Sequence, residues 1–167
     1  MALSAQVLGL VLMLASNAPG KDACALLTAA EIKAFAGAAV GKGEATVVPA
    51  VGGSTCRYEW GPRTPKSGPY YLTITVSEGA KMWPNTPPAT VKQAMISAAT
   101  HDARSNSGVI AGLGDAGTFK STRPDRISTT AYLKGLILDV SYEAFGTDAR
   151  SRKDQVIGLL KAAAKRL

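Results

Sequence analysis

The sequence holds two cysteines, Cys24 and Cys56, and their chemistry depends on the compartment in which they meet. Residues 7–15 form an apolar run, which is followed by the small and turn-forming residues 16–20. A transmembrane helix needs about 20 apolar residues, so the run is too short to span a bilayer and has the length of a signal-peptide core. Exported proteins meet an oxidising compartment, where thiols pair. We therefore predict a Cys24–Cys56 disulfide; two buried free thiols are the alternative.

The N-terminal segment predicts an exported protein. We assign residues 1–20 to a signal peptide, with cleavage before Lys21, and residues 21–167 to a single α+β domain in the periplasm or outside the cell. Residues 1–6 contain no Lys or Arg, so either the free amino terminus supplies the positive charge or the true start lies upstream. A buried N-terminal helix is the alternative. We expect no lipid anchor on Cys24, because Lys21 stands where a lipidation motif has an apolar residue.

His101 is the single histidine of the chain, and Asp102 follows it directly. Neighbouring residues on a helix do not face each other, so the two side chains are not positioned as a catalytic dyad. The sequence has no Gly-x-Ser-x-Gly motif for a nucleophile and no tight cluster of carboxylates. Two cysteines and one histidine are too few ligands for a zinc site. We predict no catalytic residue and no metal ligand.

Glycines 112, 114 and 117 match the dinucleotide-binding pattern Gly-x-Gly-x-x-Gly. That motif works only between a strand and a helix whose N-terminus faces the pyrophosphate. Here a predicted helix precedes the glycines, and Thr118-Phe119-Lys120 with Pro124 follow them. We therefore predict a glycine-rich turn in which Asp115 accepts hydrogen bonds from nearby backbone N–H groups. No cofactor is expected.

Aromatic residues are concentrated between positions 58 and 83, and two tryptophans border proline-rich loops. Aromatic side chains on loops are common anchors for partners. We predict a contact surface at these loops, made by Trp60, Met82, Trp83, Tyr70 and Tyr71. For both tryptophans the alternative is a place in the core, which for Trp60 lies beside Tyr58 and Cys56.

The chain is basic, with 19 Lys and Arg residues against 12 Asp and Glu residues and a net charge of +7. The basic residues are most frequent from Arg150 to Arg166. A positive surface attracts anionic lipid head groups or polyanionic polymers of a cell envelope, although a solvated helix face explains the same pattern. No RNA-binding or helix-turn-helix motif is present, so we predict no nucleic-acid partner.

The periodicity of apolar residues predicts an α+β fold. A capping box at Thr28 and Glu31 opens the first helix, and Gly37 ends it. A second capping box, from Ser151 to Asp154, opens the last helix. The other expected elements are strands at residues 45–51, 55–60, 70–77, 118–120, 127–133 and 136–142, a loop at 82–88 and a helix at 89–104. We predict a two-layer sandwich in the order α-β-β-β-α-β-β-β-α, with helices on one face of an antiparallel sheet of about six strands.

The chain resembles a family of secreted bacterial domains of unknown function, many of them lipoproteins, with a PsbP-like α+β fold. The resemblance is carried by residues 24–32, residues 56–58 with Trp60, the turn at 112–116 and the hairpin at 132–140. It implies the same fold, export and the bridge between the two cysteines. It carries over no catalytic residue, and this chain departs from the lipoprotein members in having no lipidation motif.

These observations favour an exported, non-catalytic binding or accessory module of the bacterial cell envelope. Its ligand is an unidentified protein or small molecule. One alternative is an inhibitor or immunity-type protein that acts through the aromatic loops. The other is a hydrolase that uses His101 in a cleft which the sequence does not reveal.

Overall fold

The computed structural model describes residues 21–64, 67–101 and 106–167, so the predicted signal peptide at residues 1–20 lies outside the described residues. The strands are β1 (Glu44–Val48), β2 (Gly53–Trp60), β3 (Tyr70–Glu78), β4 (Asn106–Val109), β5 (Ala116–Arg123), β6 (Arg126–Leu133) and β7 (Leu136–Ala144). The helices are α1 (Ala29–Ala36), α2 (Gly79–Met82), α3 (Pro88–His101) and α4 (Lys153–Ala164).

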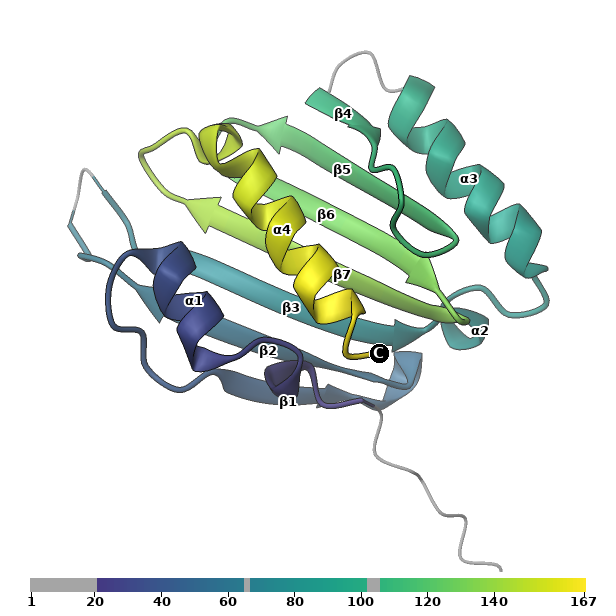
Figure 1. Ribbon diagram of the computed structural model, residues 1–167, viewed down its shortest axis with the longest axis horizontal. Coiled ribbons are helices and arrows are strands. Elements are labelled where there is room, and N and C mark those ends of the chain that lie inside the picture. Colours follow the sequence, from purple (N-terminus) through teal and green to yellow (C-terminus); the bar gives the residue numbers. More distant parts are fainter. Residues whose placement is uncertain (1–20, 65–66, 102–105) are drawn as a thin grey trace, which may run out of the picture.

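The strands form one antiparallel sheet in the order β1-β2-β3-β7-β6-β5-β4 (Figure 1). The N-terminal strands β1 to β3 and the C-terminal strands β4 to β7 each run as a meander. The two meanders join where β3 pairs with β7, with Ile74 opposite Val140. The predicted α+β class and the antiparallel sheet are confirmed.

The main core lies between the sheet and the helices α1 and α4, which cross the same face of the sheet in Figure 1. Alternating residues of the central strands contribute to this core, as Leu72, Ile74 and Val76 do in β3. From α4 the fully buried side chains Val156 and Leu160 pack against them. We call this the inner face of the sheet and the opposite one the outer face.

The prediction of about six strands is wrong, because the described residues form a seven-stranded sheet. The additional strand is β4, which pairs Val109 with Thr118 and Ser107 with Lys120 of β5. Its sequence is Asn-Ser-Gly-Val, with no alternation of apolar and polar residues and with little strand propensity. Hydrogen bonds to β5 stabilise it instead. The element order therefore differs from the predicted one, since α2 and β4 are inserted.

The prediction that all helices pack on one face is also wrong. Val91 of α3 packs in a second cluster with Ala116, Tyr132 and Ile137. These three sheet residues are directly paired across β5, β6 and β7, and their strand neighbours point into the main core. They therefore point to the outer face, where α3 lies against β4 and β5 and its Val91 side chain packs in one cluster with Tyr132 and Ile137. Helix α3 adds a partial third layer, and the rest of the outer face has no helix on it among the described residues.

The two predicted capping boxes have different outcomes. At α1, the Glu31 N–H donates to Thr28 Oγ1 (3.2 Å) and the Thr28 N–H donates to Glu31 Oε2 (2.7 Å), as predicted. At α4 the box is wrong: the Ser151 hydroxyl donates to the Asp148 carbonyl oxygen (2.7 Å). Asp148 instead caps a short 3-10 turn, accepting from the Arg150 N–H (2.9 Å), and α4 follows that turn.

Candidate functional site

The two cysteines form a disulfide, as predicted. Cys24 lies in a 3-10 turn before α1, and Cys56 lies fully buried in β2, with Cα atoms 5.0 Å apart. The same segment is held by Ser54 of β2, which accepts from the Ala23 N–H (2.9 Å) and donates to the Lys21 carbonyl oxygen (2.7 Å). The bond therefore joins the beginning of the described chain to the second strand of the sheet.

The glycine motif is a structural turn. The strand β5 begins at Ala116, so no helix follows the glycines. The Asp115 N–H donates to the Tyr132 carbonyl oxygen (2.9 Å), and its carboxylate accepts from the Lys134 N–H (3.3 Å). The turn is thus fixed to the hairpin between β6 and β7, and its backbone lacks the strand–turn–helix arrangement that binds a pyrophosphate.

We expect Gly114→Ala to lower the free energy of unfolding by about 2 kcal/mol. Gly114 has a φ of 55°, and a Cβ there would lie 2.7 Å from Leu133 Cβ and 2.8 Å from the Tyr132 carbonyl oxygen. The control is Gly112→Ala, whose φ is 68° but whose Cβ would meet nothing within 4 Å, so the loss should be about 1 kcal/mol. Urea unfolding of both variants measures the difference. Equal losses would contradict the role of the contact with β6.

His101 is exposed at the end of α3. Its Nδ1 lies 2.9 Å from the Ser97 carbonyl oxygen, 3.1 Å from Thr100 Oγ1 and 3.4 Å from Ser97 Oγ. Every hydrogen bond that the structure describes for this ring therefore goes to the last turn of its own helix. Asp102 lies outside the described residues.

The five residues of the predicted contact surface do not lie together. Trp60 and Tyr70 are on the inner face at one end of the sheet, where each packs with Tyr142; the Trp60 and Tyr142 ring centroids are 6.0 Å apart. Both are partly buried against the main core, which favours the core alternative for Trp60. Met82 and Trp83 follow β3 at the opposite end of that strand, so they form a separate surface.

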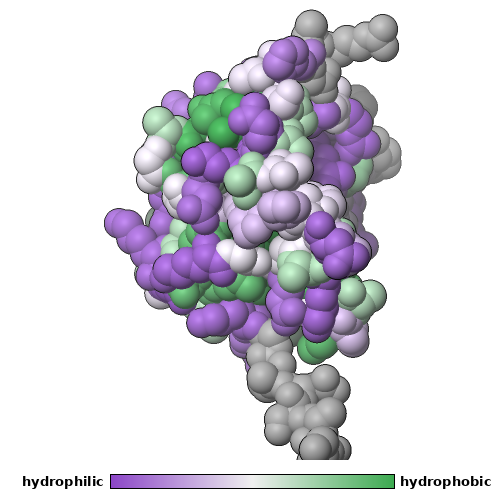
Figure 2. All heavy atoms as spheres, turned by 90° about the vertical axis from the view of Figure 1, so that its right-hand side faces the viewer, coloured by the Kyte–Doolittle hydropathy of each residue, from purple (hydrophilic) through white to green (hydrophobic). Residues whose placement is uncertain are grey.

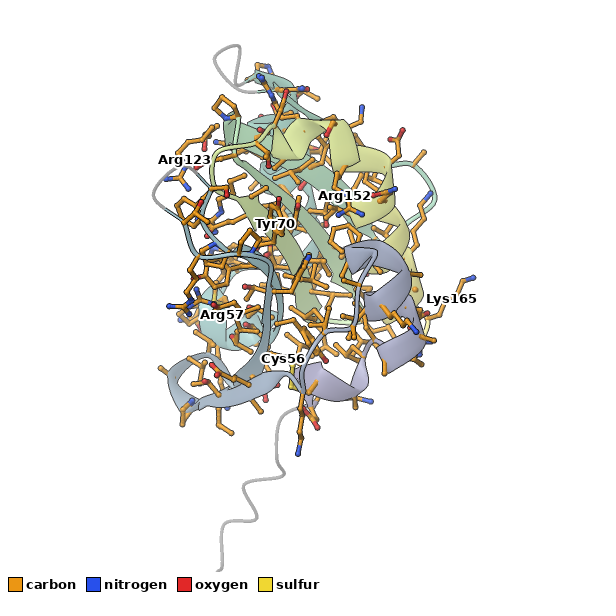
Figure 3. All side chains as sticks on the ribbon, turned by 90° about the vertical axis from the view of Figure 1, so that its left-hand side faces the viewer. Cys56, Arg57, Tyr70, Arg123, Arg152 and Lys165 are labelled. Carbon is orange, nitrogen blue, oxygen red and sulfur yellow. A yellow bond between two sulfur atoms is a disulfide. The ribbon has the colours of Figure 1, made fainter. Side chains whose placement is uncertain are left out.

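Tyr71 lies on the outer face. The Arg57 guanidinium of β2 is stacked on its ring, 3.9 Å from the centroid, and Phe145 meets the ring edge-on at 6.1 Å. Figure 3 shows Arg57 and Arg123 on one side of the sheet, with α1, α4 and Lys165 on the other. Tyr71 therefore fixes the position of a cation on the face that α1 and α4 leave open.

Trp83 borders an apolar hollow on α3. Trp83 is 37% exposed and Met82 41% exposed, which is high for large apolar side chains. The hollow has a volume of about 250 Å³ and is lined by Trp83, Thr86, Thr90, Val91, Ala94, Met95 and Ala98. Figure 2, which views the molecule from this side, shows hydrophobic patches among hydrophilic residues.

A second hollow, of about 480 Å³, lies on the outer face of the sheet. It is lined by Glu44, Thr46, Thr55, Arg57, Tyr71, Thr73, Arg126, Ser141 and Glu143. Of these residues only Tyr71 belongs to the predicted contact surface, and the hollow itself was not predicted. In β3 the residues Tyr71, Thr73 and Thr75 alternate with buried residues, and this pattern predicts a polar outer face. It does not predict that side chains of five strands form one hollow there.

No protein-family model matches the chain, and no curated protein or solved structure matches it. Membership of the secreted PsbP-like family therefore stays a prediction from the residues. Across the described ranges, no helix is both long and apolar enough to cross a membrane. Within the same ranges no group of three or more His, Cys, Asp or Glu residues is suited to holding a metal ion.

Proposed function

We propose that the protein is an exported, non-catalytic binding module of the bacterial cell envelope that contacts a partner protein through Trp83 and α3. The observation that carries this proposal is the exposed Trp83 side chain beside an apolar hollow of about 250 Å³. A large aromatic side chain next to an apolar hollow is the usual composition of an interface hot spot. A partner would fill the hollow with one apolar side chain.

The loop that carries Trp83 is held in place before any partner binds. The Trp83 N–H donates to the Gly79 carbonyl oxygen (2.8 Å), and the Trp83 carbonyl oxygen accepts from the Thr86 N–H (3.3 Å). Pro84, Pro87 and Pro88 restrict the same loop. Little conformational entropy is therefore lost when a partner contacts Trp83, which favours binding.

The exposed side of α3 also suits a protein contact. Helix α3 contains one lysine, Lys92, and no acidic residue, whereas exposed helix faces in water are normally rich in charge. Ala94 and Ala98 are exposed and leave space beside Trp83. A disulfide in the chain agrees with an exported protein. An inhibitor or immunity-type protein would use the same surface, and no observation favours the hydrolase that would use His101.

We expect Trp83→Ala to leave the protein folded but to weaken partner binding by about 2 kcal/mol or more. A photo-crosslinking benzoylphenylalanine at Thr90, in the lining of the hollow, would capture the partner in the native envelope. The covalent adduct should have one defined mass, and its yield should fall at least about tenfold with Trp83→Ala.

The matched control is Phe145→Ala, which removes another exposed aromatic ring (40% exposed) at a different place in the fold. The control should keep the adduct. An adduct that persists in Trp83→Ala, or that is lost equally in both variants, would contradict the proposal.

A further inference from the structure

The outer face of the sheet is rich in polar side chains in and beside the hollow, of which Thr46, Thr55, Thr73 and Ser141 supply hydroxyl groups to its lining. In one row across the sheet Thr46, Thr55, Thr75, Asp139 and Thr130 are successive cross-strand neighbours. In the next row Arg57, Thr73, Ser141 and Ser128 follow one another. Neighbouring strands are about 4.8 Å apart, so these side chains form a regular array of hydrogen-bond donors and acceptors.

Part of this array is not used within the protein. Thr55 and Thr75 bond to each other (3.1 Å), and the Thr130 hydroxyl donates to Asp139 Oδ2 (2.9 Å). Thr46, Thr73 and Ser141 make no side-chain hydrogen bond with any residue that the structure describes. These three hydroxyls line the hollow, so they are available to a ligand.

Arg57 supplies a cation with free donors. Its flat face is stacked on Tyr71, and the N–H groups of a guanidinium point outward in its plane, so stacking leaves them accessible. Arg57 is exposed and forms no ion pair within the described part of the chain. Such an edge is suited to a bidentate contact with a carboxylate.

The charged side chains around the hollow are of two kinds. The cations are suited to a carboxylate of a ligand, and the carboxylates are suited to its hydroxyl groups. Glu143 is paired with Arg126 (3.1 Å) and Arg123 (3.7 Å), which offsets its negative charge. Glu44 stands opposite Arg57 on β1, and its carboxylate can accept from a sugar hydroxyl. Lys42 and Arg63, the latter paired with Glu59, lie at the adjoining hollow that Arg57 shares.

We infer that the outer-face hollow binds an acidic saccharide, with the sugar carboxylate on Arg57 and the sugar hydroxyls on the Thr73, Ser141 and Glu44 side chains. An apolar ligand would leave these polar groups without partners, which is costly. The volume of about 480 Å³ accommodates a short oligosaccharide segment. This site is separate from the surface that carries the proposed function, because its lining comes from β1, β2, β3, β6 and β7 and does not include Trp83.

The test is calorimetric or NMR titration of the full mature chain with a galacturonate trisaccharide at about 0.15 M salt. A galactose trisaccharide is the neutral probe. We expect saturable binding of the acidic probe and at least about tenfold weaker binding of the neutral one. Arg57→Gln should weaken binding of the acidic probe about tenfold, and Thr73→Val about threefold.

The matched control for charge is Lys165→Gln, which removes one positive charge on the opposite side of the molecule (Figure 3). It should change the affinity less than twofold, and Trp83→Ala should leave it unchanged. An unaltered thermal midpoint in Arg57→Gln excludes unfolding as the cause. No saturable binding, equal affinity for both probes, or equal weakening by Arg57→Gln and Lys165→Gln would each overturn the inference. If no partner is crosslinked at Thr90 but the saccharide still binds, the proposed function is contradicted and this inference is not.

Discussion

Replacing both cysteines, as Cys24→Ala together with Cys56→Ala, is expected to lower the free energy of unfolding by about 3.5 kcal/mol. The disulfide joins residues 32 positions apart, and the chain-entropy account gives about this value for a loop of that length. Since many domains of this size are stable by only about 5–15 kcal/mol, the loss is large. Urea unfolding of the wild type and the double variant measures it.

The expected loss of stability has a structural cause at the N-terminal end of the described chain. Cys24 lies beside the buried residues Ala23, Leu26 and Leu27, so the disulfide restrains a segment that completes the inner core. Ser54→Ala is the control, because it removes the hydrogen bonds to that segment and leaves the disulfide. It should cost about 1 kcal/mol.

Alkylation without a reductant provides a direct check of the bond. The mass of the unfolded wild-type protein should not increase, because both thiols are paired. Two alkylated thiols, or a double variant as stable as the wild type, would contradict the prediction.

The strands that the sequence predicts well are those with a clear alternation. Leu72, Ile74 and Val76 in β3 alternate with polar residues because one face is buried and most of the other is open. The strand β4 lacks this pattern, since it is stabilised by its neighbour β5 and not by burial of its own side chains. A short strand of this kind cannot be recognised without knowing which strand stands beside it.

The position of α3 left a weaker signal in the sequence. Tyr132 and Ile137 interrupt the alternation of β6 and β7, so both sides of the sheet are apolar at that hairpin. Continuous apolar residues indicate a strand that is covered on both faces. The pattern shows that the outer face is covered at that hairpin, but it does not identify the covering element, and we predicted all helices on the other face.

The candidate sites were predictable to different degrees. The predicted export implied that the two cysteines are paired without any knowledge of the fold, and the prolines around Trp83 indicate an exposed loop. The outer-face hollow depends on strand order: Thr46, Arg57, Thr73 and Ser141 come together only because β7 pairs with β3. That pairing joins segments far apart in the chain, and local patterns do not determine it.

Asp139→Asn is expected to raise the free energy of unfolding at pH 7 by up to about 3 kcal/mol. Burial raises the pKa of Asp139 to about 6, and the hydrogen bond from Thr130 and the attraction of Arg126 oppose this shift only in part. The pKa of the unfolded chain is near the ordinary value of 3.8. The folded protein therefore binds this proton more tightly than the unfolded chain does.

The sign of the pH dependence follows from that difference. Well below pH 3.8 the carboxyl group is protonated in both states and has no effect on stability through its charge. Between pH 4 and 6 the unfolded chain loses the proton first, so stability falls as pH rises. Above about pH 6 the loss is complete, and one pKa unit corresponds to about 1.4 kcal/mol. Asparagine keeps an oxygen that accepts from Thr130 and has no charge to bury.

Urea unfolding of the wild type and Asp139→Asn from pH 4 to pH 8 tests this prediction. The stability difference between the two proteins should be small near pH 4 and grow as pH rises to about 6. The control is Asp148→Asn, because the hydrogen bonds from Arg150 lower the pKa of Asp148, so its charge stabilises the folded state and the substitution should act in the opposite direction. A stability difference between wild type and Asp139→Asn that does not vary with pH would show that the fold does not raise the pKa of Asp139. If the stability difference grows with pH as expected, the carboxylate of Asp139 on the outer face lowers the stability of the protein. A destabilising polar group of this kind is typical of a binding surface and is not expected on a face selected for stability alone.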